Sequence, residues 1–454
     1  MKLNDLKEKL KSKINNSNYY FNNHEIKQQK YNKQKNVKII GITGSRGKST
    51  VCYLIHNYLK FLGYKSVLYS NCEIDSPKSF QIKKGFSETP LKRKDDLYKL
   101  VVDSEIYDTD FIVMEINETT LERGIIDDID FDVCLITNVN PKHNTEMYTE
   151  EEYIKLKKSF FERLSSNSKC KCIIGLQDMS RDLYYELKNC NSLNKFVYST
   201  DHISKVKCVP KEEINCLLKE LVSSLDGLNM LFTIDNQEIT LNTNILMPHN
   251  ALNILGFISV MKVLNMLNIK QIKRFLFDVK IPGRVETVKA SGRTIMIDLF
   301  LTPTLEVLQN YQKNKLINNI HVVTGSIGTN YKDWDEKINS KKFIEERSNS
   351  RKYAMDLVKK YSDYVYLTEN DNASETVESI CIELQNYLGP LVKSEIILNR
   401  FEAIKKAILN SVPGDVIFIS GRGNRNISCY TANGIKHFSD LESVKKIIHE
   451  LGWD

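Results

Sequence analysis

The chain has 454 residues, 41% hydrophobic and 27% charged, and its net charge of +7 is the excess of 64 basic over 57 acidic side chains. This length predicts two or three domains with their own cores, and no internal repeat or low-complexity tract is evident. The mild positive charge does not require a nucleic-acid partner and suits an anionic small molecule at least as well.

The ten cysteines form neither a Cys-x-x-Cys pair nor the Cys/His spacing of a zinc site, so we expect buried free thiols. The first residues, MKLNDLKEKLKSK, are charged throughout and do not resemble a secretion signal. The most apolar long segment, 251–269, contains three asparagines and a lysine, which indicates a buried helix and no membrane span. We therefore expect a reduced, cytoplasmic protein.

Residues 1–36 are rich in lysine and asparagine and have too few apolar positions for a core, so we expect a polar N-terminal extension. From residue 37 onward, strand-like and helix-like segments alternate, which is typical of an α/β fold with a parallel sheet wrapped by helices. The expected strands include VKIIGITG, KSVLYS, DFIVMEI, DVCLITNV and KCIIGL, and the expected helices are 48–63, 95–107 and 149–164, the last opened by Thr149.

A second α/β block begins at the Pro-Gly pair of IPGR (281–284) and includes the strand-like runs RTIMIDLF, NIHVVTGS, YVYLTEN and DVIFISGRG. We therefore expect a central ATP-binding domain at 37–280, a C-terminal Rossmann-like α/β domain at 281–454, and a hinge near 280–284.

The segment GITGSRGKST (41–50) follows a strand-like run and precedes a helix-like one. In a phosphate-binding loop, Gly44 and Gly47 would allow close approach of the backbone, and Lys48 would reach the β- and γ-phosphates. Ser49 would then lie next to Mg²⁺. The general pattern G-x-x-x-x-G-K-S/T fails at position 42, which is isoleucine, and the alternative is an ordinary glycine turn with an incidental lysine.

Polar side chains end the next two buried strands. Glu115 ends DFIVMEI, and the carboxyl ends of parallel strands are where ligands gather, so we expect it to hold Mg²⁺ and not to be a solvated strand end. Thr137, Asn138 and His143 follow the next strand in TNVNPKH. An isolated histidine is more often structural, so His143 stays open between the two roles.

The order of these motifs resembles the Mur ligase family of ATP-dependent amide ligases. GITGSRGKST matches the family loop G-x-T-G-S/T-x-G-K-S/T-S/T throughout, which accounts for Ile42. The similarity continues through TNVNPKH, EYIKLKKSFF, HNALN, PGRVE and IDLFLTPTLEVL, and among the branches of the family the tripeptide synthetases are the most similar.

The resemblance implies a role for each matched position. The loop residues would bind the nucleotide together with residues of the later motifs: Gly44, Ser45, Arg46, Gly47, Lys48, Ser49, Thr50, Asn250, Asn253, Arg284 and Asp298. The implied catalytic residues are Lys48, Lys157 and His143, with Lys157 at the position of the family's carbamylated lysine. The implied metal ligands are Ser49, Glu115 and His143.

The chain also departs from the family pattern. The family's Ser-Ser-His reads NET (117–119), the Asp of its Asp-His pair is Lys142, and the His of its Ala-His-Thr-Pro is Leu301. Its Asp-Asn-Pro-Arg, which reads the amino substrate, is DNAS (371–374), and its Gly-Lys-Gly-His-Glu is GRGNR (421–425). The short segment before residue 37 also predicts that the acceptor is not held through UDP in the family's usual way.

The resemblance implies an ATP- and Mg²⁺-dependent ligase that joins a carboxylate acceptor to an amino acid through an acyl phosphate. A poly-γ-glutamate synthetase-like or pseudomurein-type peptide ligase is an alternative within this chemistry. A degenerate nucleotide-binding protein without ligase activity is an alternative outside it. We expect small-molecule or peptide substrates and no nucleic acid, because no basic-aromatic strip is present, and the oligomeric state stays open.

Overall fold

The computed structural model describes residues 37–70, 74–75, 108–127, 129–140, 148–163, 170–189, 195–200, 209–281, 285–299, 301, 304–329, 341–422, 429–431, 434–436 and 438–453. The predicted extension at 1–36 and the predicted helix at 95–107 lie outside the described residues. So do two of the predicted site residues, His143 and Arg284.

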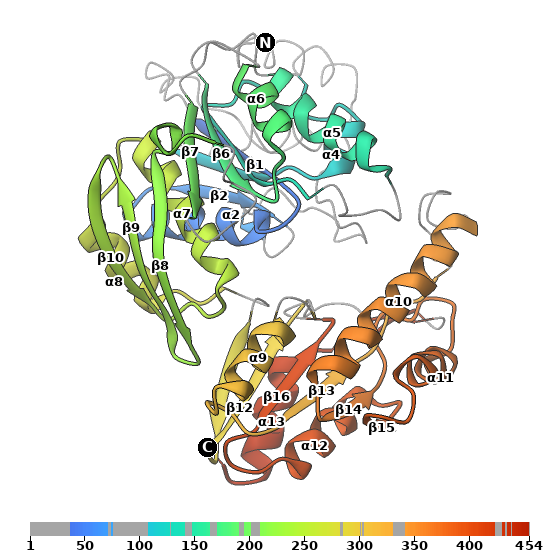
Figure 1. Ribbon diagram of the computed structural model, residues 1–454. Coiled ribbons are helices and arrows are strands. Elements are labelled where there is room, and N and C mark those ends of the chain that lie inside the picture. Colours follow the sequence, from blue (N-terminus) through green and yellow to red (C-terminus); the bar gives the residue numbers. More distant parts are fainter. Residues whose placement is uncertain are drawn as a thin grey trace, which may run out of the picture.

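Two large sheets account for most of the strands (Figure 1). The first has the order β10-β9-β8-β7-β6-β5-β1-β4-β2-β3. Its strands are β1 (Lys38–Thr43), β2 (Ser66–Tyr69), β3 (Ile74–Asp75), β4 (Phe111–Glu115), β5 (Val133–Asn138), β6 (Lys171–Gln177), β7 (Lys195–Thr200), β8 (Cys216–Ser224), β9 (Gly227–Ile234) and β10 (Gln237–Thr243). β1 lies between β4 and β5 and runs parallel to both, with Ile40 opposite Val113 on one side and Val133 on the other.

The first sheet is parallel from β2 to β8, as predicted, but both of its ends are antiparallel. β8, β9 and β10 form a meander that the sequence analysis did not predict. Its second turn uses Asp235 and Asn236, both with positive φ (50° and 63°), which suits a tight hairpin between twisted strands. The α/β fold class is confirmed, with this sheet mixed and not wholly parallel.

Helices cover both faces of the first sheet (Figure 1). They are α2 (Lys48–Phe61), α4 (Glu118–Glu122), α5 (Glu150–Arg163), α6 (Arg181–Asn189), α7 (His249–Val263) and α8 (Ile269–Asp278), with a 3₁₀ turn, η3 (Lys211–Glu213). Because alternate strand residues point to opposite faces, Ile39 joins the core beneath α5 and α6, whereas Ile40 joins the core beneath α2, α7 and α8. The strand β1 is therefore buried on both sides.

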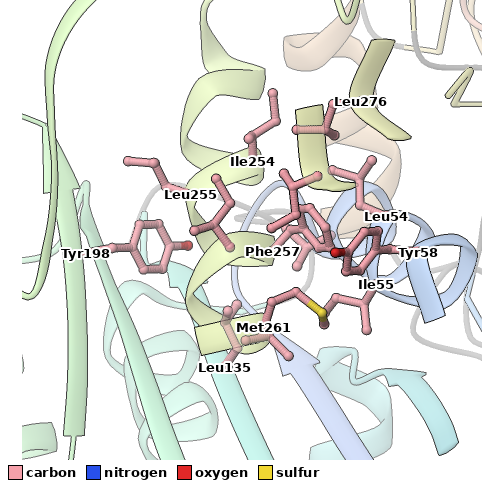
Figure 2. Packing of buried hydrophobic residues seen from close by; sticks show 14 of the residues in the cluster. Leu54, Ile55, Tyr58, Leu135, Tyr198, Ile254, Leu255, Phe257, Met261 and Leu276 are labelled. Carbon is pink, nitrogen blue, oxygen red and sulfur yellow. The ribbon is translucent and has the colours of Figure 1, made fainter. Parts of the chain in front are cut away.

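The core beneath α2 and α7 is tightly packed (Figure 2). The Tyr58 ring of α2 packs edge-on against Phe257 of α7, with ring centroids 5.3 Å apart, and against Phe275 of α8 at 5.2 Å. The predicted buried helix at 251–269 is confirmed as far as Val263, where α7 ends, and residues 264–268 leave the helix with Asn265 at φ 59°. No helix among the described residues combines the length and the apolar composition needed to cross a bilayer.

The second sheet has the order β11-β12-β16-β13-β14-β15 and is parallel except for its edge strand β11. Its strands are β11 (Glu286–Ala290), β12 (Arg293–Asp298), β13 (Ile320–Thr324), β14 (Tyr364–Leu367), β15 (Lys393–Ile396) and β16 (Val416–Ser420). Its helices are α9 (Thr304–Lys313), α10 (Lys341–Tyr361), α11 (Val377–Leu388), α12 (Arg400–Asn410) and α13 (Asp440–Glu450), and β17 (Cys429–Thr431) pairs with β18 (Gly434–Lys436).

The turn between β8 and β9 reaches the second sheet and its helices (Figure 1). Ser223 Oγ and the Tyr311 hydroxyl of α9 are hydrogen-bonded, and that hydroxyl also donates to the Ser224 carbonyl at 3.2 Å. Lys289 Nζ of β11 lies 2.6 Å from Asp226 Oδ1. In addition, Leu246 is buried in the hydrophobic core of the second sheet. The two sheets therefore share contacts, and the predicted boundary at residue 281 stays a prediction.

Acid should destabilise the fold through His56, which is buried on α2. Its ring Nδ1 lies 2.9 Å from Ser66 Oγ and its Nε2 lies 3.1 Å from Asp75 Oδ2. Burial lowers the pKa of His56 from 6.5 to about 4, although Asp75 opposes the shift. Below about pH 6.5 the unfolded chain therefore binds a proton that the native chain does not, so we expect to lose about 2 kcal/mol of the free energy of unfolding between about pH 7.5 and 5.

Urea unfolding at both pH values measures this loss, and His56→Asn is the control because it removes the titrating ring. The pKa of buried His321 is also lowered by burial, so some acid sensitivity will remain in the variant. An equal loss in the wild type and the variant would contradict the assignment to His56.

Candidate active site

The loop between β1 and α2 has the geometry of a phosphate cradle. Gly44 has φ 140° and Gly47 has φ 83°, and α2 begins immediately afterwards at Lys48. A Cβ on Gly44 would lie 2.0 Å from Thr137 Oγ1, and a Cβ on Gly47 would lie 2.0 Å from Asn253 Oδ1. Glycine is thus required at both positions for backbone conformation and for space. The N-terminus of α2, where Ser49 and Thr50 are buried, faces the loop with its positive dipole end.

The end of β5 fixes the loop from the side. Thr137 Oγ1 donates to the Arg46 carbonyl at 2.6 Å, and Asn138 Nδ2 donates to the same oxygen at 2.9 Å. The Arg46 amide donates back to Asn138 Oδ1 at 3.0 Å, and the Ser45 amide donates to the Asn138 carbonyl at 3.1 Å. These four bonds hold the loop in one conformation, which preorganises it for a ligand.

Two lysines converge on one carbonyl of the loop. Lys48 Nζ donates to the Gly44 carbonyl at 2.7 Å, and Lys157 Nζ of α5 donates to the same oxygen at 3.1 Å. Both side chains are buried, Lys157 completely. Tyr153, one turn before Lys157 on α5, donates its hydroxyl to Ser45 Oγ at 2.7 Å. The helix α5 therefore positions two side chains on the loop.

Lys157 forms a buried ion pair that the sequence analysis did not predict. Its Nζ lies 2.5 Å from Glu118 Oε1, at the start of α4. Burial lowers the pKa of Lys157 to about 8, with Lys48 adding to the shift and Glu118 opposing it. Although burial alone would raise the pKa of Glu118, Lys157 and Lys48 hold it well below its usual range. Both members of the pair are thus charged at neutral pH.

Glu115 lies at the carboxyl end of β4, as predicted, and contacts the start of α2. Ser49 Oγ donates to Glu115 Oε2 at 2.8 Å, and Ser70 Oγ donates to the same oxygen at 2.6 Å. A carboxylate beside a hydroxyl at a phosphate loop is an oxygen donor set that fits Mg²⁺, which keeps most of its waters and few protein ligands. Within the described residues no three His, Cys, Asp or Glu side chains gather as metal ligands.

The helix α7 lines the far side of the loop. Asn253 Nδ2 donates to Asn250 Oδ1 at 2.9 Å, and Asn250 Nδ2 donates to the Leu246 carbonyl at 2.8 Å. The contact between Asn253 and Gly47 joins this pair to the cradle. The structure therefore brings the loop, Glu115, Lys157 and the two asparagines together.

Asp298 lies on the second sheet, at the carboxyl end of β12. Its carboxylate accepts bonds from Thr304 Oγ1 at 2.8 Å and from the Leu299 amide at 2.7 Å. At the same edge, Arg422 Nη1 donates to Asp371 Oδ1 at 2.9 Å, with both side chains buried. The two segments that depart from the family pattern, DNAS and GRGNR, are thus joined by an ion pair.

Three polar side chains of this site were not predicted from the sequence: Glu118, Ser70 and Tyr153. Tyr153 could have been found, because it precedes Lys157 by four residues and so shares its helix face. Glu118 and Ser70 carry no comparable signal, since only the folded chain brings α4 next to α5 and β2 next to β4.

Comparisons with known proteins agree with this geometry. A family model described as the Mur ligase middle domain matches residues 42–261. A UDP-N-acetylmuramoyl-L-alanyl-D-glutamate--2,6-diaminopimelate ligase from Buchnera aphidicola subsp. Baizongia pistaciae is 23% identical over 439 residues, which cover 95% of this chain and 80% of the relative.

Two solved structures share the fold. The MurF ligase from Thermotoga maritima in complex with ADP is similar with a TM-score of 0.57 and 16% identity, over 99% of this chain and 83% of that one. A pseudomurein peptide ligase type C from Methanothermus fervidus is similar with a TM-score of 0.58 and 14% identity, over 92% and 80%. The resemblance predicted from the motifs is confirmed.

Proposed function

Because a family model described as the Mur ligase middle domain matches residues 42–261, we propose that the chain is an ATP-dependent ligase that joins a carboxylate to an amine. The observation that carries the proposal is the cradle itself. Lys48, Ser49 and Glu115 meet at the junction of β1, β4 and α2, with Lys48 donating into the loop and Ser49 bonded to Glu115. This arrangement fits a nucleoside triphosphate with its Mg²⁺.

The chemistry requires ATP because a carboxylate does not react with an amine at neutral pH, since oxide would have to leave. Phosphorylation gives an acyl phosphate, which the amine attacks with loss of phosphate. Phosphoryl transfer depends mainly on positioning and on neutralising charge. In our proposal Lys48 neutralises the phosphate end of the nucleotide, and Ser49 and Glu115 hold Mg²⁺. Mg²⁺ supplies further charge neutralisation when bound.

The other predicted residues complete the proposed site. Thr137 and Asn138 fix the loop, and Asn250 and Asn253 lie beside it where the base of the nucleotide would be bound. We propose that the chain divides near residue 281 and that the second domain closes over the first, bringing Asp298 to the nucleotide. Closure would exclude water from the acyl phosphate.

We propose that the amine binds at the carboxyl edge of the second sheet, where Asp371 and Arg422 form their buried pair. The acceptor is a small or peptide-like carboxylate, and the reaction belongs to the acid–amino-acid ligases. The named relative is a diaminopimelate ligase, and the departures at DNAS and GRGNR argue against a simple transfer of that amino acid to this chain. We propose a cytoplasmic location because the nucleotide substrate is abundant there.

A phosphate-release assay tests the proposal. Purified protein with ATP and Mg²⁺ is tested against a panel of amino acids and a cell extract, and products are identified by mass. We expect release that requires both one amino acid and an extract component. Glu115→Gln should reduce it about 100-fold, because Mg²⁺ loses its carboxylate.

The matched control is Glu122→Gln. This glutamate ends α4 and its side chain is exposed, so the variant should retain activity. Nucleotide binding without turnover under any combination would contradict the ligase and favour a degenerate nucleotide-binding protein.

A further inference from the structure

Arg400 begins α12, and its fully buried guanidinium bonds to three other segments of the chain. Its Nε and Nη2 donate to the two carboxylate oxygens of Asp440, the first residue of α13, at 2.7 and 2.9 Å. Asp440 is also fully buried, and α12 and α13 pack on the same hydrophobic core. The two parallel bonds fix the plane of the guanidinium, because a rotation would break at least one of them.

The same guanidinium holds the ends of two strands. Nη2 donates to the carbonyl of Ser420, the last residue of β16, at 2.9 Å, and Nη1 donates to the carbonyl of Glu369, just after β14, at 3.2 Å. In the described sheet β14 and β16 are not neighbours, because β13 lies between them (Figure 1). The distance between their ends is therefore not set by a shared ladder of hydrogen bonds, and Arg400 spans it directly.

These two carbonyls lie just before the proposed amine site. Asp371 follows the first of them by two residues, and Arg422 follows the second by two residues. Asp371 and Arg422 form the buried ion pair at 2.9 Å that joins the two segments. A shift of either strand end would change the position of one member of this pair, and a misplacement of about 1 Å is enough to cost much of an enzyme's activity.

We propose that Arg400 is a positioning residue for the amine site and that Asp440 orients it from α13. The rigid fork of arginine reaches the carboxylate and both carbonyls at once, whereas the single ammonium of lysine cannot span them. The helix α13 thereby influences the amine site through Arg400. The role in amine binding rests on the proposed function, but the effect of Arg400 on the two strand ends does not.

Hydrogen exchange of the full chain, followed by mass spectrometry, tests the positioning without turnover. Arg400→Lys keeps a cation beside Asp440 but should release at least one of the two carbonyls. We expect peptides that contain residues 369–371 and 420–422 to exchange about ten-fold faster, while peptides from the interior strand β13 keep the wild-type rate. Asp440→Asn should have the same local effect. Unchanged exchange at both strand ends, or equal acceleration throughout the second sheet, would overturn the proposal.

Steady-state kinetics tests the role in amine binding, with the amino acid and extract that support phosphate release. Arg400→Lys should raise KM for the amino acid about ten-fold and change KM for ATP by less than about two-fold. An unchanged KM for the amino acid would overturn the role.

Hydroxylamine in place of the amino acid separates the amine site from the rest of the reaction. Its nitrogen bonds to the carbonyl carbon of an acyl phosphate and loses a proton, and phosphate leaves, so the product is a hydroxamate. The variant should retain most of the wild-type rate with hydroxylamine, because so small a nucleophile needs no amine site. Equal losses with hydroxylamine and with the amino acid would place the defect outside the amine site and overturn the proposal.

The matched control is Lys405→Met, on the same helix as Arg400. Lys405 also joins α12 to α13, but through a surface ion pair with Glu450 at 3.0 Å, and such pairs contribute little. Neither exchange nor kinetics should change in this variant. If the wild type releases no phosphate with any amino acid, the proposed function fails, and hydrogen exchange still decides whether Arg400 holds the strand ends.

Discussion

Replacement of Lys48 by alanine should abolish ATP turnover while the chain remains folded. Lys48 Nζ donates to the Gly44 carbonyl at 2.7 Å and to the Ser45 carbonyl at 3.4 Å, and it is buried at the mouth of the cradle. In the proposed site it would supply a positive charge directed at the phosphates of the nucleotide. Removing one such preorganised charge lowers turnover by about 100- to 1,000-fold, and we expect a loss of this size in phosphate release.

The matched control is Lys60→Ala, on the same helix, α2. Lys60 forms an exposed ion pair with Asp75 at 2.6 Å, and exposed pairs contribute little, so activity should be retained. Circular dichroism and urea unfolding would establish that both variants fold. Undiminished turnover in folded Lys48→Ala would mean that the hydrolysis arises elsewhere, and the proposed site would be wrong.

Gly47→Ala should be far more damaging than Gly63→Ala, although both glycines have nearly the same backbone conformation. Their φ angles are 83° and 87°, so a Cβ pays the left-handed strain of about 1 kcal/mol at either position. At Gly63 nothing lies within 4 Å of the added atom, whereas at Gly47 it lies 2.0 Å from Asn253 Oδ1. Asn253 would have to move and lose its bond to Asn250.

We expect Gly63→Ala to lower the free energy of unfolding by about 1 kcal/mol and Gly47→Ala by about 3 kcal/mol. Only Gly47→Ala should also abolish ADP binding, because the cradle would change shape. Urea unfolding and calorimetry measure both effects. If the two variants lost the same free energy of unfolding, the Asn253 side chain could move aside at no cost, and its contact with the loop would be unimportant.

The phosphate loop could be predicted from the sequence because its chemistry is local. Glycines, lysine and a hydroxyl occur within ten residues between a strand and a helix, and the structure keeps them together. Two residues distant in sequence were also predicted, Glu115 because it ends a strand-like run and Lys157 because a family motif marks it. Their partners were not, since the bonds of Glu115 to Ser70 and of Lys157 to Glu118 depend on how strands and helices pack.

The β8–β10 meander is a different kind of omission. Its turns contain Asp226-Gly227 and Asp235-Asn236, pairs that tolerate positive φ and are typical of tight hairpins. The signal was therefore present, but the alternation of strands and helices elsewhere favoured a wholly parallel sheet. For Asp298 the local structure was predicted and the tertiary position was not. Its strand was predicted correctly, but its distance from the loop depends on how the two sheets are arranged.

The contacts between the two sheets have a consequence for cooperativity. Leu246 and Met247 precede α7 in the chain, yet they are buried in the core of the second sheet, and Leu225 of the β8–β9 turn packs against that core. Unfolding of the second sheet would expose these side chains, which belong to the part of the chain that forms the first sheet. The free energies of unfolding of the two parts are therefore coupled. A fragment that began at residue 281 would lack part of its own hydrophobic core. The cooperative unfolding unit is therefore larger than either sheet, even though a second series of alternating strands and helices begins near residue 281 of the sequence.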